Sequence, residues 1–149
     1  GLVSDLAVEI NAENNWWGCN AGPADQDCLG ITGLVDADPW LVLTFTADQT
    51  KLIPGSVIHL TADLSQNSAG ADTSAQGAVI DGLLINFDTT YGTLDPLSAG
   101  LVNASTATTL SVPAPVTVTS ATVWALFDNQ AVEIVFGGQY YIFLPIIYR

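Results

Sequence analysis

The chain has 149 residues, of which 49% are hydrophobic and only 11% charged, and its formal net charge is −13. Lys51 and Arg149 are the only lysine and arginine. Salt bridges therefore cannot be a main stabiliser, and we expect no binding to nucleic acid or anionic membranes, which need basic side chains. No apolar run approaches the roughly 20 residues of a membrane-spanning helix, and a start at Gly1 instead of Met suggests a processed product.

The first forty residues are expected to form one strand followed by an aromatic, turn-rich cap. The strand carries apolar residues at Leu2, Leu6, Val8 and Ile10, in alternation with polar or small ones. The cap contains the runs Asn14-Asn-Trp-Trp-Gly18 and Asp36-Ala-Asp-Pro-Trp40. We predict that this cap is not a repeat.

Cys19 and Cys28, the only cysteines, close a short loop that contains glycine and proline. This spacing favours a disulfide, which would contribute about 2–3 kcal/mol in the chain-entropy account of loop closure. A zinc site is the less favoured alternative, because two thiolates need two more ligands and His59 is the only histidine. An oxidised pair indicates a location outside the cytosol.

Between residues 41 and 136, short alternating runs lie between turn residues, which is the pattern of an all-β sandwich. The expected strands lie near residues 41–48, 57–64, 85–89, 102–110, 123–127 and 132–136. The intervening stretch 65–77 is rich in Ser, Ala, Gly, Asn and Asp, so we expect an exposed loop there.

The segment 116–127 contains a change of phase, because its apolar residues stand at even positions up to Val118 and at odd positions from Val123. A strand cannot change phase without an extra residue. We therefore predict a β-bulge or a bend near Ser120 and Ala121.

Three apolar residues, Leu84, Trp124 and Leu126, fall on strand positions that should face water. An apolar outer face is typical of a binding surface or of contact with another layer of protein. A loop folded over these residues is the alternative.

The last thirteen residues, 137–149, are almost wholly apolar and aromatic and contain no carboxylate side chain. In an extended strand Tyr140, Ile142 and Leu144 would face one side, and Tyr141 and Phe143 the other. A strand that is apolar on both faces is normally covered on both, here by its own domain or by a neighbouring molecule. The expected subunit-interface residues are Tyr140, Tyr141, Ile142, Phe143, Leu144, Ile146 and Ile147, with Leu84, Trp124 and Leu126.

Three runs in the central segment carry a family pattern: Asp81-Gly-Leu-Leu-Ile-Asn-Phe-Asp-Thr-Thr-Tyr-Gly-Thr-Leu94, Trp124-Ala-Leu-Phe-Asp-Asn129, and the Pro54-Gly55 turn with Thr61-Ala-Asp-Leu64. They resemble a bacterial immunoglobulin-like domain of the invasin/intimin type, in which a DG-x-x-V-x-F strand and a TxGxL turn recur. The resemblance covers residues 41–136 and implies an immunoglobulin-like β-sandwich of a secreted surface protein. It departs from the family at Pro113 and Pro115, where a glycine turn is usual.

Two other runs, Asn11-Ala-Glu-Asn-Asn-Trp-Trp-Gly18 and Asp38-Pro-Trp40, resemble the closing segment of parallel β-helix repeats in bacterial surface proteins. Only a terminal piece is present, too short to make a solenoid alone. The ending Phe143-Leu-Pro-Ile-Ile-Tyr-Arg149 is similar to the short C-terminal segment of some secreted bacterial surface proteins.

Sequence signals for catalysis are missing. There is no GxSxG elbow, no Walker loop and no GxGxxG, and His59 lies in an alternating strand, so we expect no enzyme and no obligatory cofactor. Calcium is the metal that the acidic loops suit best, with Asp25, Asp27, Asp36 and Asp38 as candidate ligands. The alternative for these four residues is that they cap or solvate turns.

We expect three segments: a cap with a disulfide-stapled strand (1–40), a sandwich (41–136) and an apolar terminal strand (137–149). The favoured function is an extracellular, pilus-like filament, in which each copy donates an apolar strand to the next. The preferred donor is the C-terminal strand, and the alternative is the strand with Leu2, Leu6, Val8 and Ile10. The expected partner is therefore the chain itself.

The competing function is a cell-surface adhesin or a carbohydrate-binding module, with a host surface or a glycan as partner. Such a module would display Trp16, Trp17 and Trp40 to a sugar. The favoured alternative is that these tryptophans form a buried cap beneath the disulfide loop. A degraded β-helix enzyme acting on polysaccharides is a distant third.

Overall fold

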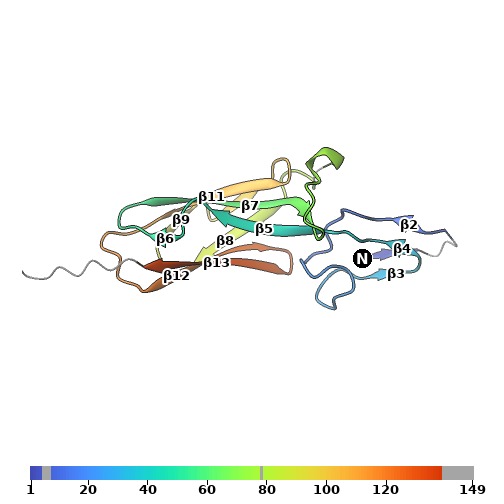
Figure 1. Ribbon diagram of the computed structural model, residues 1–149, viewed down its shortest axis with the longest axis horizontal. Helices are drawn as coiled ribbons and strands as arrows, with labels where there is room; N and C mark the ends of the chain where they lie inside the picture. The colour runs from blue at the N-terminus through green and yellow to red at the C-terminus, as the bar shows by residue number, and fades with distance from the viewer. Residues whose placement is uncertain (5–7, 78, 139–149) are drawn as a thin grey trace, which may run out of the picture.

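The computed structural model describes residues 1–4, 8–77 and 79–138, and within them the chain is nearly all β. A single 3-10 helix, η1 (Ser74–Gln76), is present in that part of the chain. The strands are β1 (Leu2–Val3), β2 (Ile10–Asn11), β3 (Ile31–Thr32), β4 (Val35–Asp36), β5 (Leu41–Ala47), β6 (Lys51–Leu52), β7 (Val57–Asn67), β8 (Leu84–Thr89), β9 (Thr93–Asp95), β10 (Ser98–Gly100), β11 (Ser105–Ser111), β12 (Ser120–Phe127) and β13 (Gln130–Gly138). Figure 1 shows a sandwich at one end of an elongated molecule and β1 to β4 at the other.

The sandwich has two sheets, with strand orders β5-β7-β11-β9 and β10-β8-β12-β13-β6. The first strand of the sandwich, β5, lies in the first sheet and pairs antiparallel with β7. The chain then crosses to the second sheet, where β6 pairs parallel with the last strand, β13. This split first strand, with three further strands in the first sheet and four in the second, is an immunoglobulin-like arrangement. The predicted fold class is confirmed.

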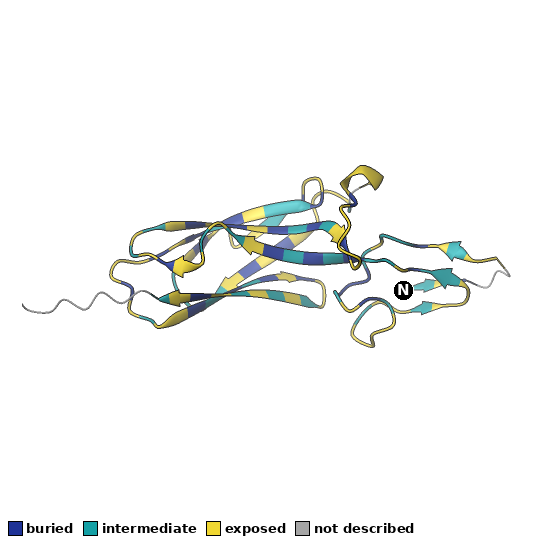
Figure 2. Cartoon of the chain, in the orientation of Figure 1, coloured by how far each residue is buried: buried dark blue, intermediate teal, exposed yellow. Residues whose placement is uncertain are grey.

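Buried and more exposed residues alternate along the strands of the sandwich, as Figure 2 shows, and the buried ones lie between the two sheets. In β7, for example, Ile58, Leu60, Ala62 and Leu64 are fully buried, while the residues between them are exposed or half-buried. Phe45 of one sheet stacks on Phe87 of the other with ring centroids 6.0 Å apart. Burial of large apolar side chains at roughly 1.5–3 kcal/mol each therefore holds the two layers together.

The described residues of the range 1–37 form two stacked turns of chain, which we call the N-terminal coil. β1 lies parallel to β3 with Leu2 opposite Ile31, and β2 lies parallel to β4 with Ile10 opposite Val35. The first rung is thus β1 with β2, and the second rung is β3 with β4. Parallel pairing between successive turns is the geometry of a β-helix coil, and it stacks aliphatic side chains in ladders.

The two rungs repeat one local motif. Asn11 Oδ1 accepts a hydrogen bond from Glu13 N (3.0 Å), and Asp36 Oδ1 accepts one from Asp38 N (3.4 Å). Asn11 and Asp36 are also direct neighbours across the ladder. The two rungs thus share one turn geometry, and the expectation of a cap without a sequence repeat stays a prediction.

Several predicted boundaries need correction. The strand expected from Leu2 to Ile10 does not exist as one element, because β1 and β2 belong to different two-stranded ladders on two sides of the coil. The stretch 65–77 is not wholly loop: β7 continues to Asn67, opposite Leu41 of β5, and η1 follows. β13 extends to Gly138 because its last two residues pair with β6.

The change of phase before β12 needs no bulge in that strand. The chain bends at Thr119, β12 begins at Ser120, and its register with β13 and β8 is unbroken. Val116 and Val118, which set the even phase, belong to the preceding loop, whereas Val123, which sets the odd phase, belongs to β12. The structure places a register shift in β5 instead, between Val42 and Thr44.

Candidate functional site

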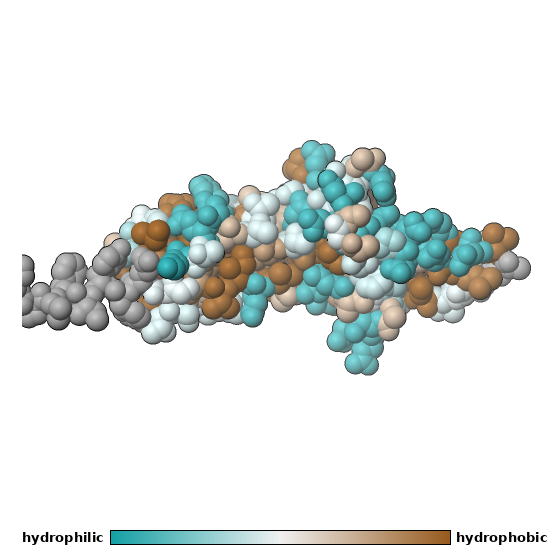
Figure 3. All heavy atoms as spheres, viewed as in Figure 1, coloured by the Kyte–Doolittle hydropathy of each residue, from teal (hydrophilic) through white to brown (hydrophobic). Residues whose placement is uncertain are grey.

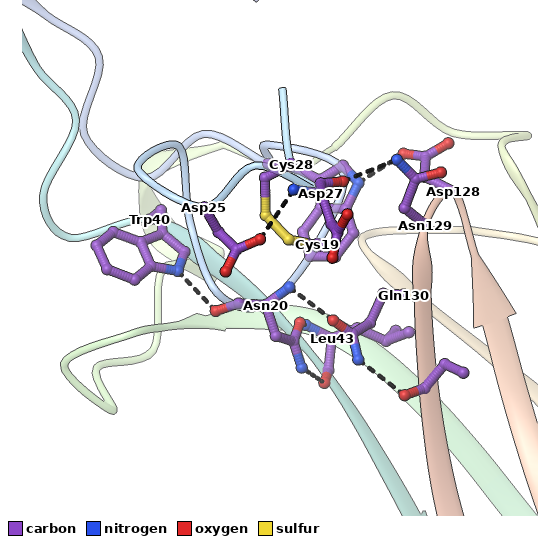
Figure 4. Close-up of a disulfide and its surroundings, with 12 residues drawn as sticks. Cys19, Asn20, Asp25, Asp27, Cys28, Trp40, Leu43, Asp128, Asn129 and Gln130 are labelled. Atoms are coloured by element: carbon purple, nitrogen blue, oxygen red, sulfur yellow. Dashed lines mark hydrogen bonds between the residues drawn. A yellow bond between two sulfur atoms is a disulfide. The ribbon is translucent and has the colours of Figure 1, made fainter. Parts of the chain in front are cut away.

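The disulfide loop joins the N-terminal coil to the sandwich. Cys19 and Cys28 are bonded, with Cα atoms 5.2 Å apart, so the predicted pairing is confirmed. Next to it, Asn20 Nδ2 donates to the carbonyl oxygen of Leu43 (2.9 Å) and Leu43 N donates to Asn20 Oδ1 (2.6 Å). Asn20 N donates to Gln130 Oε1 (2.7 Å). One asparagine therefore binds a strand of each sheet, β5 and β13 (Figure 4).

The two ends of the loop make further contacts. Asn129 Nδ2 donates to the carbonyl oxygen of Asp27 (2.9 Å), next to Cys28. Asn129 N also donates to the carbonyl oxygen of Gly18 (3.1 Å). The β12–β13 turn is thus fixed to both ends of the loop. Sequence reasoning missed this junction, because a single asparagine after a cysteine gives no signal of its distant partners.

The three candidate sugar-binding tryptophans pack in different ways. Trp16 stacks on Phe127 at 5.5 Å and its indole N–H donates to Asp128 (2.7 Å). Trp17 is buried. The half-buried ring of Trp40 lies against Gly22, where a Cβ would overlap it, and its N–H donates to the carbonyl oxygen of Asn20 (3.0 Å). Such packing supports the alternative in which these tryptophans form a cap.

Of the four candidate calcium ligands, Asp25 and Asp27 lie in the disulfide loop, Asp36 is the last residue of β4 and Asp38 follows that strand. Asp25 Oδ1 accepts a hydrogen bond from Asp27 N (2.9 Å), as Asp36 does from Asp38. Within the described ranges the only close group of potential metal-binding side chains is Asp25 with the bonded pair Cys19 and Cys28, whose sulfurs are not thiolates. A calcium site at these residues remains a prediction.

The predicted outer-surface residues lie on the five-stranded sheet. Leu84 is 61% exposed and Leu126 is 36% exposed. Trp124 is half-buried, and its indole N–H donates to Glu133 Oε2 (3.0 Å). Val135 of β13, also exposed, shares this face and was missed by the sequence reasoning. Their role in a subunit interface remains a prediction.

Two cavities flank the coil. The larger, about 720 Å³, lies between the coil and the segment 73–83 and is lined by Glu13, Asn14, Trp16 and Gln76 among others. The smaller, about 330 Å³, lies in the first rung and is lined by Leu2, Ile10, Ala12, Trp17 and Leu29 among others.

The candidate donor segments are only partly within the structure. The residues Leu6, Tyr140, Tyr141, Ile142, Phe143, Leu144, Ile146 and Ile147 lie outside the described residues. In the alternative donor, Leu2 packs against the small core of the coil, Ile10 lines the smaller cavity, and Val8 is exposed. No helix in the described part of the chain is long and apolar enough to cross a membrane.

Comparisons with known proteins give structural likeness only. No protein-family model and no curated protein sequence matches the chain. A C-terminal fragment of intimin, solved with the intimin-binding domain of its translocated receptor, is 17% identical with a TM-score of 0.48, over 66% of this chain and 32% of that one. The D0-D1 domain of intimin is 15% identical with a TM-score of 0.46, over 76% and 57% of the two chains.

Domains 4 and 5 of the S-layer protein SbsC are 17% identical with a TM-score of 0.40, over 71% of this chain and 56% of that one. The chain therefore spans between about a third and just over half of these solved structures.

Proposed function

We propose that the chain is a non-enzymatic structural subunit of an extracellular surface filament. Copies join head to tail, and the apolar C-terminal segment 139–149 of each copy is the strand donated to the next. The disulfide supports an oxidising, extracellular setting. The segment itself supports donation, because eleven residues with apolar side chains on both strand faces need cover on both.

The observation that carries the proposal is the position of the two ends of the molecule. β13 ends at Gly138 at the end of the sandwich that lies away from the N-terminal coil (Figure 1). A segment that continues from Gly138 is therefore placed to meet the coil end of the next copy in a row. Such a contact is heterologous and does not close on itself, so repetition produces a fibre.

Electron microscopy of truncated protein tests this proposal. Negative staining of the full chain at neutral pH should show filaments, and a chain that stops after Gly138 should give monomers. The stop at Gly138 keeps the pairing of Gly137 and Gly138 with β6 intact. A control with residues 139–149 replaced by a Gly/Ser sequence of equal length should behave like the truncated chain. Filaments from either variant would contradict the proposal.

The larger cavity favours a second candidate function, a glycan-binding adhesin. Its lining combines amide and carboxylate side chains with an aromatic ring, the usual composition of a polar-ligand site. Gln76→Ala tests this function without touching the Trp16 stack, and Asn86→Ala on the exposed face of β8 serves as the control. Retained glycan binding in Gln76→Ala would argue against this cavity as the site.

A further inference from the structure

The strand donated by one copy needs an acceptor, and the sandwich offers little room for one. Each described strand of the sandwich pairs within its own sheet, and the core residues are buried. The strands β5 and β13, which belong to different sheets, have Cα atoms within 8 Å of each other. Insertion of a third strand between them needs about 9.6 Å, twice the usual spacing of paired strands.

The N-terminal coil, in contrast, is open at its first rung. Among the described residues β1 pairs only with β3, and β2 only with β4, so each keeps one edge without a neighbour. The hydrogen bonds from Leu2, Ser4, Ile10 and Ala12 all point to the second rung. The residues between them, Val3 and Asn11, therefore direct their backbone groups to the open side, since bonding alternates along a strand.

The interior of this first rung is apolar and incompletely filled. The smaller cavity of about 330 Å³ lies there, lined by Leu2, Ile10 and Trp17 among others. Trp17 is 6% exposed, yet its indole N–H has no acceptor in the part of the chain that the structure describes. A buried donor without an acceptor is costly, so the packing around Trp17 is not optimal in the single copy. Figure 3 shows apolar surface at this end of the molecule as well as along the sandwich.

We propose that the open first rung, formed by the free edges of β1 and β2 and the cavity between them, accepts residues 139–149 of a second copy. This inference rests on the proposed function and names the acceptor of its donated strand. Main-chain hydrogen bonds to Val3 and Asn11 provide the pairing, and apolar side chains of the tail fill the cavity.

The spacing of the tail matches that of a rung. In the second rung the inward residues Ile31 and Val35 are four positions apart, and the two-residue corner Gly33-Leu34 separates their strands. Gly33 has φ +94°, and a Cβ there would overlap the backbone of Ser4, so this corner requires glycine. In the tail, Ile142 and Ile146 are likewise four positions apart. The pair Leu144-Pro145 separates Ile142-Phe143 from Ile146-Ile147, as Gly33-Leu34 separates β3 from β4. Stacked on the first rung, Ile142 lies above Leu2 and Ile146 above Ile10.

Charge favours the same pairing. Residues 1–40 contain seven carboxylate side chains and no Lys, Arg or His, whereas residues 139–149 contain Arg149 and no Asp or Glu. In a chain of net charge −13, most surfaces of two copies repel each other. The tail has no acidic side chain, so its approach to the acidic coil meets less repulsion than contact between other surfaces.

A photo-cross-linking experiment with the full chain tests the proposal. Isotopically labelled and unlabelled copies, each with p-benzoylphenylalanine in place of Phe143, are mixed, polymerised and irradiated, and cross-linked peptides are identified by mass spectrometry. We expect links between position 143 of one copy and residues 1–12 of another. Links to β5 or β13 of another copy would overturn this acceptor and leave strand donation standing. Links only within one copy, from monomeric protein, would overturn both, and filaments without links to residues 1–12 would overturn the acceptor.

A substitution in the cavity gives a second measurement. Ile10→Asp places a charge where the tail must bury, so the protein concentration needed for filaments should rise at least about tenfold. Leu34→Asp, at an exposed corner of the same coil, is the matched control and should change it little. An intact Cys19–Cys28 bond and unchanged circular dichroism show that each variant is folded. An equal rise of this concentration in both variants would contradict the proposal. Filaments that require Ile10 but not residues 139–149 would also contradict it, because they would indicate that coils stack directly on each other.

Discussion

The sandwich and the N-terminal coil solve the same problem, the stability of a β structure, by different physical means. Twenty buried residues form one continuous core between the sheets of the sandwich, whereas the coil encloses a small core of Ala12, Trp17 and Ala37. The coil compensates with directed contacts: a disulfide, turns repeated at Asn11 and Asp36, and the bonds of Asn20 to both sheets. Apolar burial dominates one region, and covalent and polar bonds dominate the other.

The comparison implies that core truncations should affect the two regions unequally. Leu60→Ala in the fully buried centre of β7 should cost about 2–5 kcal/mol, because the sheets cannot close around the lost volume. Ile31→Ala in the half-buried ladder of the coil should cost about 1 kcal/mol, since less area is removed from water. Urea denaturation of both variants measures the difference. Similar losses would mean that the coil depends on burial as much as the sandwich does.

Loss of the disulfide should affect the coil alone. Cys19→Ser with Cys28→Ser should destabilise the loop by about 2–3 kcal/mol in the chain-entropy account. Hydrogen exchange should then accelerate in residues 1–40 and remain slow in β7 and β12, whose bonds are independent of the loop. Uniform acceleration throughout the sandwich would show that the two regions unfold as one unit.

The link between the two regions is tested at Asn20. Asn20→Ala removes the side-chain partner of both Leu43 N and Leu43 O, and should cost about 1–2 kcal/mol because two backbone groups lose their bonds. Asn86→Ala, on the exposed face of β8, is the matched control and should be nearly neutral. Thermal unfolding measures both, and an equal shift in the two variants would rule out a special role for Asn20.

The smallest effect is electrostatic and lies outside both cores. The backbone N–H of Ser74, and then its hydroxyl, donate to Asp72 and hold the pKa of this exposed carboxyl below its ordinary value. A lowered folded-state pKa contributes stability above the unfolded pKa, and this contribution is lost as pH falls through the folded value. NMR titration should therefore find Asp72 more acidic than in Ser74→Ala, and a higher or equal pKa would contradict this account.

Sequence reasoning reached the sandwich more completely than the coil, for a physical reason. Alternation in β5, β7 and β13 is local, and burial between two sheets enforces it, so the strands and the fold class were predictable. The pairing of Leu2 with Ile31 and of Ile10 with Val35 is long-range and involves strands of two residues each. Such strands are too short to show periodicity, and only the related runs at Asn11 and Asp36 could have indicated them.

The candidate site was predicted in the same uneven way. The bonded pair Cys19–Cys28 followed from composition, and the exposure of Leu84 followed from its strand phase. The bridge from Asn20 to Leu43 and Gln130 did not, because a side chain that imitates a strand backbone has no sequence signature. The open rung depends on which edges remain unpaired, and that is a property of the assembled fold.

The parallel pairing of β6 with β13 has a mechanical consequence. Lys51 lies opposite Gly137, and Leu52 opposite Gly138, at the point where the chain leaves the sandwich. In a fibre under tension, force entering through the N-terminal region and leaving through the C-terminal segment would pull these two strands in opposite directions along their length. Their hydrogen bonds would then be loaded in shear and share the load, instead of peeling apart one by one. The short parallel pair of β6 and β13 would thus resist separation when the proposed fibre is stretched.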